Sequence, residues 1–251
     1  MISTVYAVLF YVATILLIVG TGMKVLKYAR TPAPLKIPVS PAPRTRAGVV
    51  MRMAREVFIF QSLFKSNRWI WILAILFHYG MLLVLLRHLR YFTQPVWWWV
   101  DLIQPIGVYA SFAMLAGLGG LLVRRIMVQR IRYISAPSDY LMLALLLGIA
   151  ISGAGMKFVL PVDILAVKAF MLGLMRFQIN DLPTQPGVLI HLALVVILMI
   201  IFPISKLMHA PGLFFAPSRT QVDNARKFRH LSAWAKQLPP LPEGIPQEGD
   251  K

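Results

Sequence analysis

Histidine is the residue type in this 251-residue chain whose spacing points most clearly to chemistry. His78 and His88 lie within one apolar run, His191 lies near the start of another, and His209 follows that second run directly. An ionisable imidazole inside a membrane marks a candidate functional site, and its neutral ring binds metal ions. Ten residues of α-helix separate His78 from His88 by about 15 Å, too far for one metal ion. The pattern predicts two bis-histidine haems at different depths.

These histidines have two other interpretations. A single membrane histidine is more often a hydrogen-bonded packing residue than a ligand, but four of them on two helices at matched depths are hard to explain by packing. A metal or proton path lined by histidines usually recruits carboxylates as well. Here Asp101, Asp139 and Asp163 all fall at the edges of apolar runs. The haem hypothesis is therefore preferred.

The composition is that of an integral membrane protein. Hydrophobic residues make up 58% of the chain, and its mean hydropathy is +0.70. The absence of cysteine excludes disulfides, covalent haem attachment through Cys-x-x-Cys-His and cysteine-ligated iron–sulfur clusters within this chain. The net charge of +17 comes from basic residues between the apolar runs, which favours roles in topology and lipid contact over nucleic-acid binding.

The elements that must position the histidines are long apolar helices. We expect an all-α integral membrane protein whose five transmembrane helices form a haem-binding bundle. The expected spans are 1–27, 69–91, 105–123, 139–159 and 188–209, joined by a basic cytoplasmic loop at 28–68 and an outer-side surface segment at 160–187, with a cytoplasmic tail at 210–251.

Several local features are also expected. The first span has neither a basic start nor a short apolar core, so it is a retained helix and not a cleaved signal peptide. Residues 49–64 form an amphipathic surface helix, and Pro203 bends the last span. The glycines of the third span allow close helix packing or the approach of a porphyrin; they are Gly117, Gly119 and Gly120. A short helix is expected at 220–237, followed by a proline-rich end that is either disordered or ordered only by a partner.

Charge bias predicts the orientation. Of the 26 lysines and arginines, 21 fall in the first loop, the third connector and the tail. With five spans, these segments share one side, which the positive-inside rule makes cytoplasmic. We therefore expect the N-terminus outside and the C-terminus inside, in the cytoplasmic (inner) membrane of a bacterium or archaeon.

Helix direction then predicts which histidines pair. The second span runs outward and the fifth runs inward, so His88 and His191 lie near the outer face, whereas His78 and His209 lie near the cytoplasm. If the fifth span is continuous, its histidines are about 27 Å apart and share a face after five turns. Helix tilt and a bend at Pro203 must accommodate the difference from 15 Å.

These residues resemble the cytochrome b (gamma) subunit family of respiratory nitrate reductase. The match includes Leu-Phe-His78-x-Gly with a histidine ten residues on, a histidine pair eighteen apart, Phe202-Pro-Ile-Ser-Lys-Leu-Met-His209, and Arg124-Arg125. Within that family, segment 206–226 is most similar to DsrM, the membrane cytochrome of the DsrMKJOP complex associated with dissimilatory sulfur metabolism.

The resemblance implies two haem b groups and a partner. By its pattern, His88 and His191 bind a distal haem, and His78 and His209 bind a proximal one. Quinol, the reduced form of menaquinone or ubiquinone, would react near the distal haem. A cytoplasmic-side iron–sulfur subunit, DsrK-like, would dock at the proximal haem, with further subunits in the complex. The family has a lysine near the start of its third span where this chain offers Asp101 and Gln104.

The expected function is electron transfer between the quinone pool and the iron–sulfur partner, in a quinol-linked oxidoreductase of sulfur metabolism. Arg87, Arg90, Gln104 and Lys206 are candidates for contact with haem propionates or the quinone; for the basic ones, interfacial snorkelling is the alternative. Other functions left open are the cytochrome b subunit of a nitrate reductase or of another quinol-linked reductase, and a non-redox transporter or scaffold.

Overall fold

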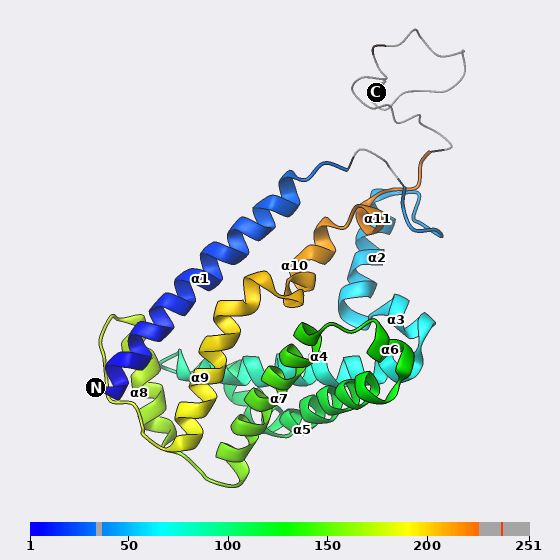
Figure 1. Cartoon of the computed structure of the whole chain (residues 1–251). Coiled ribbons are helices and arrows are strands. Elements are labelled where there is room, and N and C mark those ends of the chain that lie inside the picture. The colour runs from blue at the N-terminus through cyan, green and yellow to red at the C-terminus, as the bar shows by residue number, and fades with distance from the viewer. Residues whose placement is uncertain (34–36, 226–236, 238–251) are drawn as a thin grey trace. The chain divides into compact units, whose positions relative to one another are not determined.

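A computed structural model describes residues 1–33, 37–225 and 237 of the chain, and every regular element within them is a helix (Figure 1). The α-helices are α1 (Ile2–Arg30), α2 (Arg46–Ile59), α3 (Gln61–Ser66), α4 (Arg68–His88), α5 (Trp98–Met127), α6 (Gln129–Tyr133), α7 (Pro137–Phe158), α8 (Ile164–Met175), α9 (Pro186–Ile201), α10 (His209–Gly212) and α11 (Pro217–Thr220). Short 3-10 turns are η1 (Leu89–Tyr91), η2 (Phe202–Ile204), η3 (Lys206–Met208) and η4 (Leu213–Phe215).

The chain divides into two units, which are described separately. The first unit contains residues 1–17 and 62–201, and the second contains residues 18–61 and 202–251.

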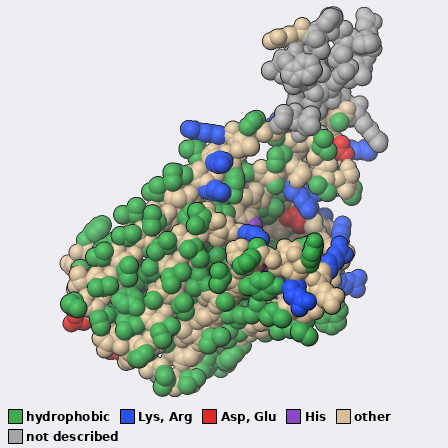
Figure 2. Space-filling view, in the orientation of Figure 1, with side chains coloured by type: hydrophobic (Ala, Val, Ile, Leu, Met, Phe, Trp, Pro, Cys, Tyr) green, Lys and Arg blue, Asp and Glu red, His purple; other side chains and the backbone are tan. Residues whose placement is uncertain are grey.

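Five helices in the described residues are long and apolar enough to cross a membrane. They are Ile2–Arg30, Arg68–Tyr91, Trp98–Met127, Pro137–Phe158 and Pro186–Ile204. Their large apolar side chains face outward, as at Ile18 (66% exposed) and Leu141 (72% exposed), and hydrophobic side chains are spread over the helical surface visible in Figure 2. An exterior this apolar requires lipid as its solvent. The expected all-α membrane fold is confirmed.

Glycines bring α4 and α5 into backbone contact in the first unit. A Cβ added at Gly80 would lie 2.7 Å from the backbone nitrogen of Met114, and one at Gly117 would lie 2.6 Å from that of Phe77. At Gly120 an added Cβ would meet the side chain of Leu73 at 2.5 Å. Gly119, by contrast, has no atom within 4 Å of such a Cβ. Helix packing therefore accounts for Gly117 and Gly120 without a porphyrin.

The later spans of the first unit pack one after another, starting from α5. Helix α7 packs on α5, and α9 packs on α7. The start of α1 packs against α8 and α9, where Phe170 and Val188 are buried. The Tyr6 hydroxyl donates to the Leu189 carbonyl oxygen (2.8 Å), and the Tyr11 hydroxyl donates to that of Leu174 (3.0 Å). Helix α8 has 12 residues, too few to span a membrane.

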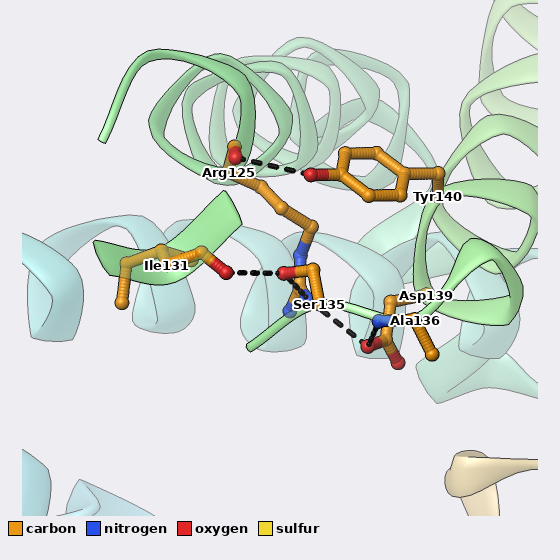
Figure 3. Close-up of polar contacts among 6 residues, drawn as sticks. All are labelled: Arg125, Ile131, Ser135, Ala136, Asp139 and Tyr140. Atoms are coloured by element: carbon orange, nitrogen blue, oxygen red, sulfur yellow. Dashed lines mark hydrogen bonds and ion pairs between the residues drawn. The ribbon is translucent and has the colours of Figure 1, made fainter. Parts of the chain in front are cut away.

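A buried ion pair closes the connection between α5 and α7 (Figure 3). Arg125 Nη1 lies 3.2 Å from a carboxylate oxygen of Asp139, whose side chain is 8% exposed, and donates to Ser135 Oγ at 2.7 Å. The same carboxylate accepts the backbone N–H of Ala136, and the Tyr140 hydroxyl donates to the Arg125 carbonyl oxygen. Asp139 and Arg125 therefore fix the turn between two spans.

In the second unit, the segment after α9 is held by the first loop. The backbone N–H of Val39 donates to the Ser218 carbonyl oxygen, and that of Asp223 donates to the Pro43 carbonyl oxygen. The loop helix α2 also pairs with α11, through Glu56 Oε1 and Arg219 Nη1 at 3.3 Å. The tail up to Ala225 is therefore held by contacts within this chain, and the proline-rich end after residue 237 lies outside the described residues.

Some element bounds differ from those expected. Helix α5 starts at Trp98 and contains Pro105, so most of the expected connector at 92–104 is helical. The surface helix expected at 49–64 is two helices, α2 and α3, divided at Phe60 by a left-handed residue with φ of 48°.

Helix α9 ends at Ile201, where a span to residue 209 was expected. Pro203 has no N–H to continue the helical hydrogen bonds, and 3-10 turns follow the end of α9. Of the helix expected at 220–237, Thr220 closes α11, and residues 221–225 are not helical. Its remainder lies largely outside the described residues.

Candidate haem sites

His88 and His191 meet in the first unit. His88 is the last residue of α4, and His191 lies in the second turn of α9. Their ring centroids are 6.5 Å apart, and the ring planes differ by 16°. The two helices come from opposite ends of the series α4, α5, α7 and α9, and both rings are largely shielded from solvent. The structure thus brings together the two histidines that helix direction pairs.

Each of the four candidate histidines uses Nδ1 in a hydrogen bond. Three of them contact a carbonyl oxygen of their own segment: Nδ1 of His78 lies 2.8 Å from Ala74, that of His88 2.6 Å from Val84, and that of His209 2.9 Å from Lys206. A carbonyl oxygen only accepts, so each of these Nδ1 atoms carries the proton, and the lone pair is on Nε2. This tautomer is the one that histidine ligands of metals adopt.

His191 is the exception, because its Nδ1 partner comes from another helix. Ser152 Oγ of α7 lies 2.9 Å from that nitrogen. The next residue of α7 is Gly153, where an added Cβ would lie 3.2 Å from His191 Cε1. Sequence reasoning assigned α7 no part in the site. A serine among the glycines of an apolar span, Gly148, Gly153 and Gly155, is the signal that it overlooked.

Arginine side chains flank His88 in the first unit. Arg90 Nη1 donates to Gln104 Oε1 (3.3 Å), and its Nη2 donates to the Tyr91 hydroxyl (2.9 Å). The Gln104 amide nitrogen donates to the Arg87 carbonyl oxygen (3.3 Å). Among the described residues, the Nε atoms of Arg87 and Arg90 are buried without a hydrogen-bond partner. Three of the candidate polar residues are therefore gathered beside His88, with donors left over for an anion.

His78 and His209 lie in different units and are related here only to their own neighbours. His78 is half-buried in the middle of α4, with its ring centroid 4.6 Å from that of Phe77. His209 begins α10 and lines a cavity of about 400 Å³ in the second unit. The candidate Lys206 lines this cavity too, together with the end of α1; the other lining residues are Tyr28, Thr31, Pro32, Ser205, Met208, Gly212, Phe215 and Pro217.

The residues at His88 and His191 fit a haem. A metal ion bound between two imidazoles lies about 2 Å from each nitrogen, which places the ring centroids roughly 6 Å apart. The observed separation is 6.5 Å. The unpaired donors on Arg87 and Arg90 match the charge of propionates. Among the described residues, no group of three or more His, Asp or Glu forms a metal site from protein ligands alone.

Comparison with known proteins identifies the family of this chain. The family described as nitrate reductase gamma subunit matches residues 45–225. A protein of Archaeoglobus fulgidus named Hdr-like menaquinol oxidoreductase cytochrome b-like subunit is 34% identical over 296 aligned positions, covering 99% of this chain and 89% of that protein. Its namesake in Archaeoglobus profundus is 32% identical over 294 positions, covering 95% of this chain and 86% of that protein. This chain belongs to the nitrate reductase gamma subunit family.

Proposed function

We propose that this chain is the dihaem cytochrome b subunit of a membrane-bound menaquinol oxidoreductase. The single observation that carries the proposal is the pair of nearly parallel rings of His88 and His191, 6.5 Å apart, on two membrane-spanning helices. His78 and His209 are proposed as the ligands of the second haem, because each has the same tautomer. The menaquinol assignment is supported by the names of the Archaeoglobus relatives.

The proposed role is electron transfer across the membrane. Haem with two axial histidines supplies one-electron transfer and has no open position for oxygen. Oxidation of the quinol at the outer side would release its protons there and pass its electrons to an iron–sulfur partner on the cytoplasmic side. The expected orientation, with the N-terminus outside in the cytoplasmic membrane, rests on the distribution of lysine and arginine. A role in sulfur metabolism rests on the resemblance of segment 206–226 to DsrM.

The haem content tests the proposal directly. Pyridine haemochrome analysis of the purified chain should give two haem b per polypeptide. One haem or none would contradict it. A colourless protein would favour the alternative function, a non-redox transporter or scaffold.

Quinone chemistry is proposed beside His88. The gathered polar groups are Arg87, Arg90 and Gln104, whose side chains combine two cations with a hydrogen-bonding amide. Such groups can hold either a propionate or a quinone headgroup. Replacing Arg90 by Gln should slow menaquinol oxidation at least tenfold if it contacts the quinone. Arg176→Gln is the control, because Arg176 is an exposed arginine of the same unit. Equal rates in both variants would place the quinone elsewhere.

A DsrK-like iron–sulfur subunit is proposed as the partner of the cytoplasmic side. The basic first loop, α6 and the segment after His209 provide a positively charged surface for an acidic face. Truncation after Pro217 should release that subunit from the membrane with both haems kept. Because this truncation also removes Arg219, the partner of Glu56, a second truncation after Ala225 is needed. Partner release by both truncations supports docking by residues 226–251. Retention by the longer chain would exclude those residues.

The co-purified subunits separate this proposal from its closest alternative. A nitrate-reducing catalytic subunit would indicate a nitrate reductase. An Hdr-like iron–sulfur subunit would support the Hdr-like menaquinol oxidoreductase named for the relatives.

A further inference from the structure

Helix α7 contributes a hydroxyl to the ring of His191, and the direction of its hydrogen bond can be worked out. Ser152 Oγ lies 2.7 Å from the Gly148 carbonyl oxygen, 3.1 Å from that of Ile149 and 2.9 Å from His191 Nδ1. A hydroxyl has one proton to donate, and a carbonyl oxygen can only accept. Donation to the Gly148 carbonyl oxygen, the shortest of the three contacts, leaves Ser152 Oγ to accept the N–H of His191. This direction puts the His191 proton on Nδ1 and leaves Nε2 free for a metal.

The backbone around Ser152 is shaped so that this contact can form. A Cβ added at Gly153 would lie 3.2 Å from His191 Cε1, closer than most side-chain contacts. One turn earlier, a Cβ added at Gly148 would lie 3.3 Å from Leu194 Cδ1 of α9. The two glycines thus let α7 approach α9 on both sides of Ser152, which sets the hydroxyl against the imidazole.

We propose that Ser152 and Gly153 are positioning residues for His191, holding its ring plane and its tautomer for the haem. The proposal rests on the proposed function, since it requires His191 to be a ligand. It also makes the two ligands of one haem unequal. His88 donates to a carbonyl oxygen of its own helix, whereas the acceptors beside His191, the Ser152 hydroxyl and the Ile149 carbonyl oxygen, both belong to α7.

The proposal predicts a redox effect. A hydrogen bond accepted from Nδ1–H increases the basicity of the ligating nitrogen, which favours the oxidised metal. Removing the acceptor should raise the midpoint potential of this haem, and freeing the ring should change the low-spin electron paramagnetic resonance signal that reports ligand orientation. Loss of such an outer hydrogen bond weakens metal binding roughly 10- to 100-fold, so weaker haem retention is also expected.

The test replaces Ser152 in the purified chain by Ala, Thr and Val, and measures the midpoint potentials and the resonance spectrum. Thr and Val have the same shape, so they separate the hydroxyl from bulk. Ala and Val should raise the potential of one haem, and Thr should keep the parent value. Ser111→Ala is the control for loss of a serine bond within a helix, because that hydroxyl donates to the Val108 carbonyl oxygen. Loss of the haem in Ala and Val but not in Thr would equally support the proposal.

A second comparison tests the close approach of Gly153 to the His191 ring and leaves the Ser152 hydroxyl in place. Gly153→Ala should shift the resonance signal of the same haem, whereas Gly155→Ala should not, because nothing lies within 4 Å of a Cβ at Gly155. Unchanged potentials in every Ser152 variant, or equal effects of Thr and Val, would overturn the role of the hydroxyl.

The failures of the two proposals are distinguishable. If His191→Ala leaves both haems in place, His191 is not a ligand, and both the pairing and the role of Ser152 are wrong. If His191→Ala removes a haem but the Ser152 variants behave as the parent does, only the positioning role is wrong.

Discussion

The surroundings of His191 and of His209 differ in how the chain builds them. His191 lies within the continuous helix α9, against α7 and beside His88. His209 lies after a run of 3-10 turns, at the edge of a cavity that short segments line, and its side chain is exposed. The difference begins at Pro203, where α9 loses its helical hydrogen bonding. A ligand on a long packed helix is held by its neighbours, whereas one on short turns relies on few local bonds.

The largest expected effect tests whether these two surroundings belong to two different haems. His88→Ala and His191→Ala should each remove the same haem, because each would delete one of the two ligands proposed for it. His78→Ala and His209→Ala should each remove the other. Potentiometric titration of the b-type absorption band would identify which component is lost.

The control for this experiment is the fifth histidine, His230, which lies outside the described residues. His230→Ala should keep both haems. A spectrum in which the His78 and His88 variants lose one common haem would contradict the pairing and would leave the His88–His191 contact as packing.

The sequence predicts the helical elements well and the tertiary contacts poorly. Apolar runs with two histidines identify α4 because hydropathy and spacing are local properties. The partner of His191 Nδ1 could not be predicted, because Ser152 is 39 residues away and its role depends on how α7 packs on α9. The face shared by His191 and His209 was predicted from five whole turns, and that argument is wrong because α9 stops at Ile201. Periodicity alone cannot show where a proline ends a helix instead of bending it.

The turn between α5 and α7 offers the next largest effect. Asp139→Ala would leave Arg125 without its carboxylate in a mostly buried site and would remove the acceptor of the Ala136 N–H. We expect a loss of about 2–3 kcal/mol in the free energy of unfolding, since hydrogen bonds to charged groups contribute about that much. Thermal unfolding in detergent would measure it. Asp101→Ala, an exposed carboxylate at the start of α5, is the control and should change little.

Backbone packing in the first unit is tested by two neighbouring glycines of α5. Gly117→Ala puts a Cβ 2.6 Å from the Phe77 nitrogen, and overpacking of this kind costs about 1–3 kcal/mol. Gly119→Ala meets nothing within 4 Å, so it should be neutral or slightly stabilising through the better helix propensity of alanine. Loss of haem in Gly119→Ala, with stability unchanged, would instead assign that open face to a porphyrin.

The smallest effect is expected in the second unit, at the ion pair between Glu56 and Arg219. The Arg219 side chain is 30% exposed and that of Glu56 is 13% exposed, so water reaches one side of the pair, and we expect a contribution of about 0–1 kcal/mol, the range of surface ion pairs. A double-mutant cycle of Glu56→Gln and Arg219→Gln should give a coupling energy within that range, measured as protection of the tail from proteolysis, and it should fall at high salt. Backbone bonds at Val39 and Asp223 hold the same segment, so each single variant should keep the tail attached. A coupling of several kcal/mol that resists salt would mean that the pair is desolvated. The tail segment of the second unit would then be held by a desolvated ion pair in addition to its backbone bonds, much as the turn between α5 and α7 is held in the first unit.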